Sequence, residues 1–121
     1  MADETINLTN YEIDLYLTIL NDFLDNSGKF GYAIARNYRV FQSSIVEFYN
    51  IKLKIMEKYA KKVDDDYIIK PDDPNYFIAK KKIDEVGNIS HKFNICKISM
   101  NDLPDTLTAR NIIDLDWMIE D

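Results

Sequence analysis

The sequence is poor in the residues that interrupt helices and form tight turns, with three glycines and three prolines among 121 residues. Hairpin turns and barrel corners depend on such residues, so their scarcity argues against an all-β fold. The single cysteine, Cys96, excludes an intramolecular disulfide. Asp3 and Glu4 stand where a signal peptide carries positive charge, and no apolar run approaches the ~20 residues that span a bilayer. We therefore expect a protein of a reducing cytoplasm, without a membrane segment.

The composition is otherwise that of a folded globular protein, with 46% apolar and 30% charged residues. A chain of this length usually forms one domain around one core, so we expect a single domain over 1–121. The pattern predicts an α+β fold, mostly helical. An N-terminal antiparallel helical hairpin over 9–62 is followed by a mixed α/β remainder over 63–121.

The first predicted helix covers about residues 10–26. Thr9 with Glu12 forms a capping box, and Leu8 with Ile13 forms a hydrophobic staple. The apolar positions of this helix follow a spacing of four, three and four, and they are Ile13, Leu17, Leu20 and Leu24.

A second helix is predicted from Phe30 to about Lys62, near 50 Å long at ~1.5 Å per residue. The connection around Gly28 is short, so the two helices must be antiparallel and the first covers only half of the second. The uncovered half must pack against the C-terminal part of the chain, which we expect, or against a second copy. The candidate oligomer face consists of Phe48, Ile55, Met56 and Tyr59.

The C-terminal half carries weaker signals for alternating short elements. Its apolar positions shift phase after Ile95, which suggests a strand with a β-bulge. The expected elements are a short strand at Tyr67–Ile69, a turn at Pro71–Pro74, a short helix from Tyr76 to Val86, the bulged strand from Ile89 to Met100, and a last helix capped by Asp105 or Thr106 that carries Leu107 to Ile119.

Charge is distributed unevenly along the chain. Residues 1–28 have a net charge of −6, residues 29–62 of +6 and residues 63–121 of −6. The simplest interpretation is that the acidic and basic helices attract each other and fix the hairpin. A second is that the basic helix and its aromatic residues bind nucleic acid. A third is that the acidic clusters imitate a phosphate backbone and bind the basic groove of a nucleic-acid-binding protein.

No catalytic, metal or cofactor motif is evident. Zinc needs about four ligands, whereas the chain offers His91 and Cys96, which a regular strand would place on opposite faces. His91 is best interpreted as a strand residue partly buried beside Phe93. The aspartates of 64–66 and 72–73 lack the spacing of a calcium-binding loop, and the glycines fit no phosphate-binding loop. We expect no cofactor and no enzymatic activity.

The order of elements resembles an uncharacterised family of small proteins encoded by phages and prophages of low-GC Gram-positive bacteria. The resemblance rests on the leading helix over Leu8–Leu24, the turn at Gly28, and a long helix that contains Arg36 and Arg39 and ends in the run 58–62. A strand before a terminal helix completes it. The resemblance implies a viral protein that acts inside a bacterial cell by binding another protein.

Three functional hypotheses follow. The first is a non-enzymatic protein that binds and inhibits a nucleic-acid-binding or defence protein of the host, as anti-CRISPR proteins do. No direct contact with nucleic acid or membrane is expected. The second is a virion structural or assembly factor that oligomerises, for example as a homodimer, through the second helix. The third is a metal-dependent hydrolase built on the loop aspartates. The acidic residues expected to bind the partner are Asp64, Asp65, Asp66, Asp72, Asp73, Asp102, Asp105, Asp114 and Asp116.

Overall fold

The structure, a computed structural model, describes residues 2–120 and has the predicted α+β fold with helices in the majority. Two short 3-10 turns, η1 (Met100–Asp102) and η2 (Asp116–Met118), flank the last helix. The helices and strands in chain order are β1 (Ala2–Thr9), α1 (Asn10–Asn21), α2 (Gly28–Tyr59), β2 (Lys61–Val63), β3 (Asp66–Ile68), α3 (Tyr76–Gly87), β4 (Ser90–Ser99), α4 (Ala109–Asp114) and β5 (Ile119–Glu120).

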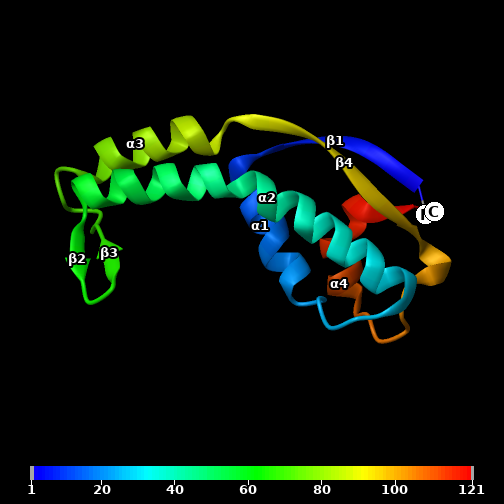
Figure 1. The fold of residues 1–121 in the computed structure, drawn as a ribbon. Coiled ribbons are helices and arrows are strands. Elements are labelled where there is room, and N and C mark those ends of the chain that lie inside the picture. Colours follow the sequence, from blue (N-terminus) through cyan, green and yellow to red (C-terminus); the bar gives the residue numbers. More distant parts are fainter. Residues whose placement is uncertain (1, 121) are drawn as a thin grey trace.

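Helix α2 connects two differently built parts of the molecule (Figure 1). Its 32 residues span about 48 Å at ~1.5 Å per residue. The first half packs with α1 and with β4 of the sheet, and we call this part, which also contains α4, the body. The second half runs beside α3 and ends at the β2–β3 hairpin; we call residues 49–87 the arm. Within the described chain, no helix combines the length and the apolarity that crossing a membrane requires.

The body sheet has the strand order β1-β4-β5. β1 and β4 are antiparallel in an unbroken register from Ala2 opposite Lys97 to Thr9 opposite Ser90. The predicted bulge is therefore wrong, because no residue is inserted. The phase shift that suggested it arises because β4 is buried on both faces, with Ile95 and Cys96 each at most 1% exposed.

The start of α1 confirms the predicted capping box. The Thr9 hydroxyl accepts a hydrogen bond from the Glu12 N–H at 3.2 Å, and the Glu12 carboxylate accepts one from the Thr9 N–H at 3.0 Å. The helix ends at Asn21, five residues earlier than predicted. Asp22 and Asp25 place negative charge at its C-terminal end, where the helix dipole is unfavourable to it. Leu24 is consequently outside the core and 41% exposed.

Helix α2 forms the predicted antiparallel hairpin with α1. It begins at Gly28, whose φ of +69° favours glycine. It ends at Tyr59 rather than near Lys62, because Lys61–Val63 pair with Asp66–Ile68 as a hairpin. The expectation that the same chain covers the second half of α2 is confirmed, since α3 packs along it.

The C-terminal elements differ from the prediction in their boundaries. The short strand is β3, one residue earlier than expected, and α3 matches the predicted helix to within one residue. The last helix is capped by Thr108, not by Asp105 or Thr106, because Thr108 and Asn111 exchange the two bonds of a capping box. It ends at Asp114, and the chain continues into β5, which pairs in parallel with β4 at Ile98 and Ile119.

Candidate functional site

The nine carboxylates predicted to form the partner surface separate into two groups. Five lie at the far end of the arm, on the β2–β3 hairpin and the loop that follows it. Four lie at the opposite end of the molecule, around η1, α4 and η2 (Figure 1). The arm group is Asp64, Asp65, Asp66, Asp72 and Asp73, and the body group is Asp102, Asp105, Asp114 and Asp116. A single partner groove of ordinary size would not contact both groups.

The hairpin turn presents the arm carboxylates to solvent. Asp64 adopts a φ of 56° at the turn, a conformation that aspartate tolerates better than most residues. In the next loop, the Asp73 carboxylate accepts a hydrogen bond from the Asn75 N–H at 2.8 Å, which fixes the entry to α3. A hollow of about 400 Å³ opens here, between the hairpin and the loop. Its lining residues are Lys61, Val63, Ile68, Lys70, Asp72 and Asp73.

Exposed apolar side chains accompany these carboxylates. Phe77, in the first turn of α3, is 71% exposed and stands edge-on to the Tyr76 ring at a centroid distance of 5.4 Å. Val63 and Ile68 of the hairpin and Ile78 of α3 are each between 46% and 49% exposed. Sequence reasoning missed this group, because an apolar residue on a predicted helix is normally assigned to its buried face. The arm therefore ends in a mixed acidic and apolar surface, which we call the arm end.

The body group of carboxylates is more dispersed. Asp102 in η1 lies 3.9 Å from the Lys29 ammonium at the start of α2, so part of its charge is compensated. The main-chain carbonyl of Asp114 accepts a hydrogen bond from the Trp117 indole at 3.0 Å, which closes the end of α4. Asp105 and Asp116 are exposed. Of these residues, Asp102 makes a structural contact through its carboxylate, whereas Asp114 does so through its main chain.

The predicted oligomer face is only partly accessible. Phe48 is 3% exposed and stacks edge-on against the Tyr11 ring at 5.7 Å, so it belongs to the core of its own chain. Its inclusion in an oligomer face is therefore wrong. Ile55, Met56 and Tyr59 are half-buried along α3.

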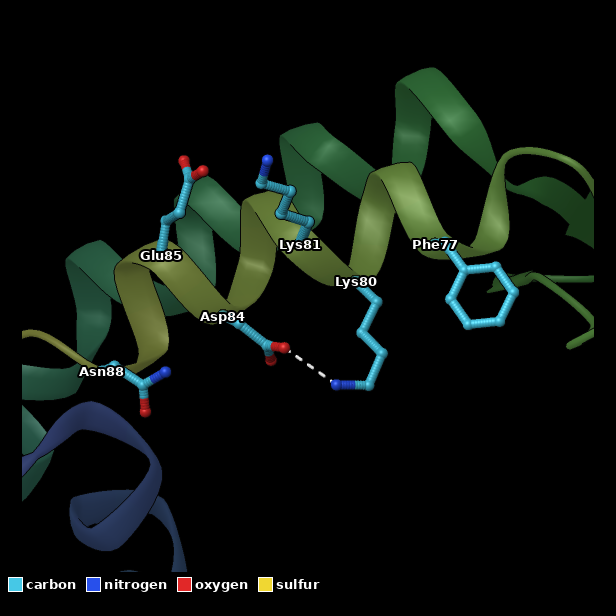
Figure 2. A pocket seen from close by; sticks show the side chains of 6 residues that line it. All are labelled: Phe77, Lys80, Lys81, Asp84, Glu85 and Asn88. Atoms are coloured by element: carbon cyan, nitrogen blue, oxygen red, sulfur yellow. Dashed lines mark hydrogen bonds and ion pairs between the residues drawn. The ribbon is translucent and has the colours of Figure 1, made fainter.

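A junction of polar contacts fastens the arm to the body. The Tyr11 hydroxyl of α1 donates to the Asp84 carboxylate of α3 at 2.5 Å. Figure 2 shows Lys80 reaching along α3 to the same carboxylate, at 2.8 Å, while Phe77 points away from this group. The Lys80 bond and then the Tyr11 bond hold the pKa of Asp84 below its ordinary value. Burial and the bond to Asp84 raise the pKa of Tyr11 from 10.0 to about 12. Tyr11 is thus a neutral hydrogen-bond donor and Asp84 an ionised acceptor.

The same junction is closely packed at the C-terminal end of α3. A Cβ atom on Gly87 would lie 2.4 Å from Cζ of Tyr11, so only glycine allows this approach. The Asn10 side-chain amide donates to the Val86 carbonyl at 2.8 Å, and the Asn10 N–H donates to the Ile89 carbonyl at 3.1 Å. These contacts assign the Tyr11–Asp84–Lys80 group a role in positioning α3.

The remaining site hypotheses gain little support. Within residues 2–120, no three His, Cys, Asp or Glu side chains are placed to hold a metal ion, so the hydrolase hypothesis has no supporting geometry there. His91 is half-buried beside the Phe93 ring, as predicted, at a centroid distance of 6.2 Å. Phe41 and Phe48, two aromatic residues of the basic helix, are buried and therefore not accessible to nucleic acid.

No ion pair between two described residues joins the acidic helix to the basic helix, so the attraction between them stays a prediction. Among the described residues, the ion pairs join Lys29 to Asp102, Lys80 to Asp84, and Lys97 to Glu4, and none of these joins α1 to α2. The contact that does link the two helices through an aspartate is a hydrogen bond from the Tyr49 hydroxyl to the Asp14 carboxylate. Apolar residues of both helices, among them Ile13 of α1 and Ile45 of α2, belong to one buried core, and their burial stabilises the hairpin.

Comparison with known proteins gives no further assignment, since no protein-family model, curated protein or solved structure matches this chain.

Proposed function

We propose that this chain is a non-enzymatic protein of phage or prophage origin that binds a nucleic-acid-binding or defence protein in the cytoplasm of a bacterial host through the arm end. Inhibition of that protein, as by anti-CRISPR proteins, is the expected consequence. The resemblance to small phage proteins supports the origin. The arm end supports the binding.

The observation that carries the proposal is the combination of carboxylates and exposed apolar side chains at the arm end. Isolated exposed apolar residues are common on protein surfaces, but Phe77, at 71% exposure, and the exposed Val63 and Ile68 all belong to elements that meet at the arm end (Figure 1). Protein interfaces typically centre on an aromatic anchor surrounded by polar and charged residues. A surface that bound only through charge would not need these apolar groups.

The chemistry of the arm end also indicates the kind of partner. Residues 61–73 contain five aspartates and three lysines and have a net charge of −2. A basic partner surface with an apolar recess matches this combination, as in a protein channel that otherwise holds a phosphate backbone. Nucleic acid itself does not, because its phosphates would be repelled.

The proposal is tested by affinity capture of the tagged protein from host lysate at low and moderate salt, with quantitative comparison of variants. Simultaneous replacement of Asp64, Asp65 and Asp66 by lysine should reduce recovery of the principal partner at least tenfold, and Phe77→Ala should reduce it further. The loss with salt should be stronger for the native chain than for the lysine variant, since screening weakens exposed charge interactions.

Two matched controls are available at the other end of the molecule. Ile113 in α4 is 74% exposed, so Ile113→Ala removes a comparable exposed side chain without affecting the arm. Replacement of Asp105 and Asp116 by lysine makes a similar change of charge in the body. Undiminished binding by the arm variants, with loss in these controls, would move the binding surface to the body and contradict the proposal.

A further inference from the structure

The outer edge of β1 has backbone groups without partners. β1 is an edge strand of the body sheet and pairs only with β4. The hydrogen bonds of Cys96, the β4 residue opposite Asp3, show which backbone groups of β1 face β4 and which face outward. The Cys96 N–H donates to the Asn37 side-chain oxygen at 2.7 Å, and the Cys96 carbonyl accepts from the Asn37 amide at 2.9 Å. Both backbone groups of Cys96 therefore point away from β1.

Hydrogen bonding alternates along an antiparallel pair, so the other residues of β1 are assigned by counting from Asp3. Two bonds at the C-terminal end of β1 agree with this count: the Thr9 N–H donates to Glu12, away from β4, and the Asn10 N–H donates to the Ile89 carbonyl. Asp3, Thr5 and Asn7 consequently direct their N–H and C=O groups outward. Within residues 2–120, no hydrogen bond to these groups is present.

This edge lacks three of the features that normally prevent pairing between edge strands, namely proline, lysine and a β-bulge, and its charged residues are Asp3 and Glu4. Thr5 and Asn7 are exposed, so the edge is accessible. Glu4, the described charged side chain on this strand, already lies 3.2 Å from the Lys97 ammonium.

We infer that β1 pairs in antiparallel fashion with β1 of a second copy of this chain, about a two-fold axis through Thr5. This register places Thr5 opposite Thr5 and Asp3 opposite Asn7, so all three outward-facing residues are used. Three pairs with two bonds each give about six backbone hydrogen bonds. The two body sheets then form one continuous sheet across the dimer.

The side chains favour a second copy as the occupant, because the strand is self-complementary in this register. Glu4 falls opposite Ile6 of the second copy, and Thr5 faces Thr5, a favourable cross-strand pair. The two Glu4 carboxylates become diagonal neighbours, and each is compensated by the Lys97 ammonium of its own chain, 3.2 Å away. The two Ile6 side chains become diagonal neighbours, roughly 7–8 Å apart, on the face where Leu8 is buried. Ile6, half-buried in the single chain, gains an apolar neighbour.

The test is the molar mass in solution, measured by light scattering after size exclusion over a wide range of loading concentrations. We expect a mass approaching twice the 14.2 kDa of one chain as concentration rises, because a single strand pair gives a weak dimer, on the order of micromolar. Thr5→Pro removes an outward N–H while leaving the β1–β4 bonds in place, and should give a monomer with native circular dichroism. Ile55→Glu, on the arm, should leave the dimer intact.

Disulfide crosslinking provides a second test of the dimer, which remains usable if Thr5→Pro fails to fold. In the proposed register the Cα atoms of the two Thr5 residues are about 5.5 Å apart, within disulfide range, so Thr5→Cys should form a disulfide-linked dimer on mild oxidation. Asn7→Cys should not, because the two positions are offset by about 13 Å along the strands. The native Cys96 is 1% exposed and serves as the background control. The inference would be overturned by a monomer at every concentration, by a dimer that is lost in Ile55→Glu, or by equal crosslinking at both positions. If the chain is a monomer and its β1 edge binds an extended segment of another protein, the edge is assigned to that partner.

Discussion

Replacement of Asn37 should be among the most destabilising single changes in this chain. Asn37 is fully buried in α2 and hydrogen-bonds both backbone groups of Cys96. These groups lie on the β5 side of β4, but β5 pairs only with Ile98 and Ser99 and does not reach Cys96. The Asn37 amide thus takes the place of a neighbouring strand. Asn37→Leu keeps a similar volume but leaves one N–H and one C=O unpaired in the core, at about 1–3 kcal/mol each. The expected loss is about 2–6 kcal/mol, against about 5–15 kcal/mol for a whole domain.

Urea unfolding followed by the fluorescence of Trp117 measures this loss. Trp117 stacks on Tyr16 at a centroid distance of 4.6 Å in the body, so its emission reports on the core. Asn94→Leu is the matched control, because Asn94 is an exposed asparagine of β4, the strand that Asn37 contacts. The reasoning is refuted if Asn37→Leu unfolds within about 0.5 kcal/mol of Asn94→Leu, the range of an ordinary surface change.

Three further predictions concern the arm and its junction. Gly87→Ala should lower stability by about 1–3 kcal/mol in urea unfolding, because the new methyl overlaps the Tyr11 ring, even though alanine favours helix; a neutral result would mean that the ring moves freely. The stability that neutral Tyr11 contributes should be complete below pH 10.0 and lost as pH rises through about 12, so Tyr11→Phe should show a smaller fall in the urea midpoint over that range; identical slopes would contradict this. Amides of the arm should exchange hydrogen faster than those of the first half of α2, because the only described residues of the arm that are buried are Ala79 and Gly87. Equal protection of both parts, measured by mass spectrometry, would show that the arm unfolds only together with the body.

Local signals were sufficient for the helical part of the fold. The capping box at Thr9 and Glu12 fixes the start of α1, and the apolar stripe of α2 identifies a long helix because nothing interrupts it. The end of α1 was misjudged, since Leu24 continued the apolar spacing. Asp22 and Asp25 indicate an earlier end of the helix, because acidic residues are unfavourable at a helix C-terminus.

The sheet could not be predicted to the same extent, because its order depends on contacts between distant residues. β5 has only two residues, which pair with β4, and no local pattern identifies a strand of that length. The Asn37–Cys96 contact joins residues 59 positions apart. β1 did leave a signal, the alternation of polar and apolar residues over Thr5–Leu8, which is typical of a strand with one buried face.

Of the candidate site, the sequence predicted the acidic residues but not the exposed apolar side chains beside them. The five arm aspartates are close in sequence, and this predicts that they lie together. Their distance in space from the body group could not be predicted, because it is set by the long helix α2, which runs from the body to the arm end. The role of Phe77 required knowledge of which side of α3 meets α2. Since α3 buries only Ala79 and Gly87, its apolar positions do not reveal that side.

The two proposed surfaces lie on different parts of the molecule, and this makes their effects separable and their combination informative. β1 belongs to the body, whereas the arm end is reached through the second half of α2 (Figure 1). A dimer through β1 therefore carries two arm ends. On a partner with repeated basic sites, the second contact would be intramolecular, which strengthens overall binding by about 10²–10⁴ if the geometry permits both. Thr5→Pro should then weaken capture by such a partner while leaving the affinity of one arm for one isolated site unchanged. If capture and single-site affinity are both unaffected by Thr5→Pro, each arm acts alone and the dimer has another purpose.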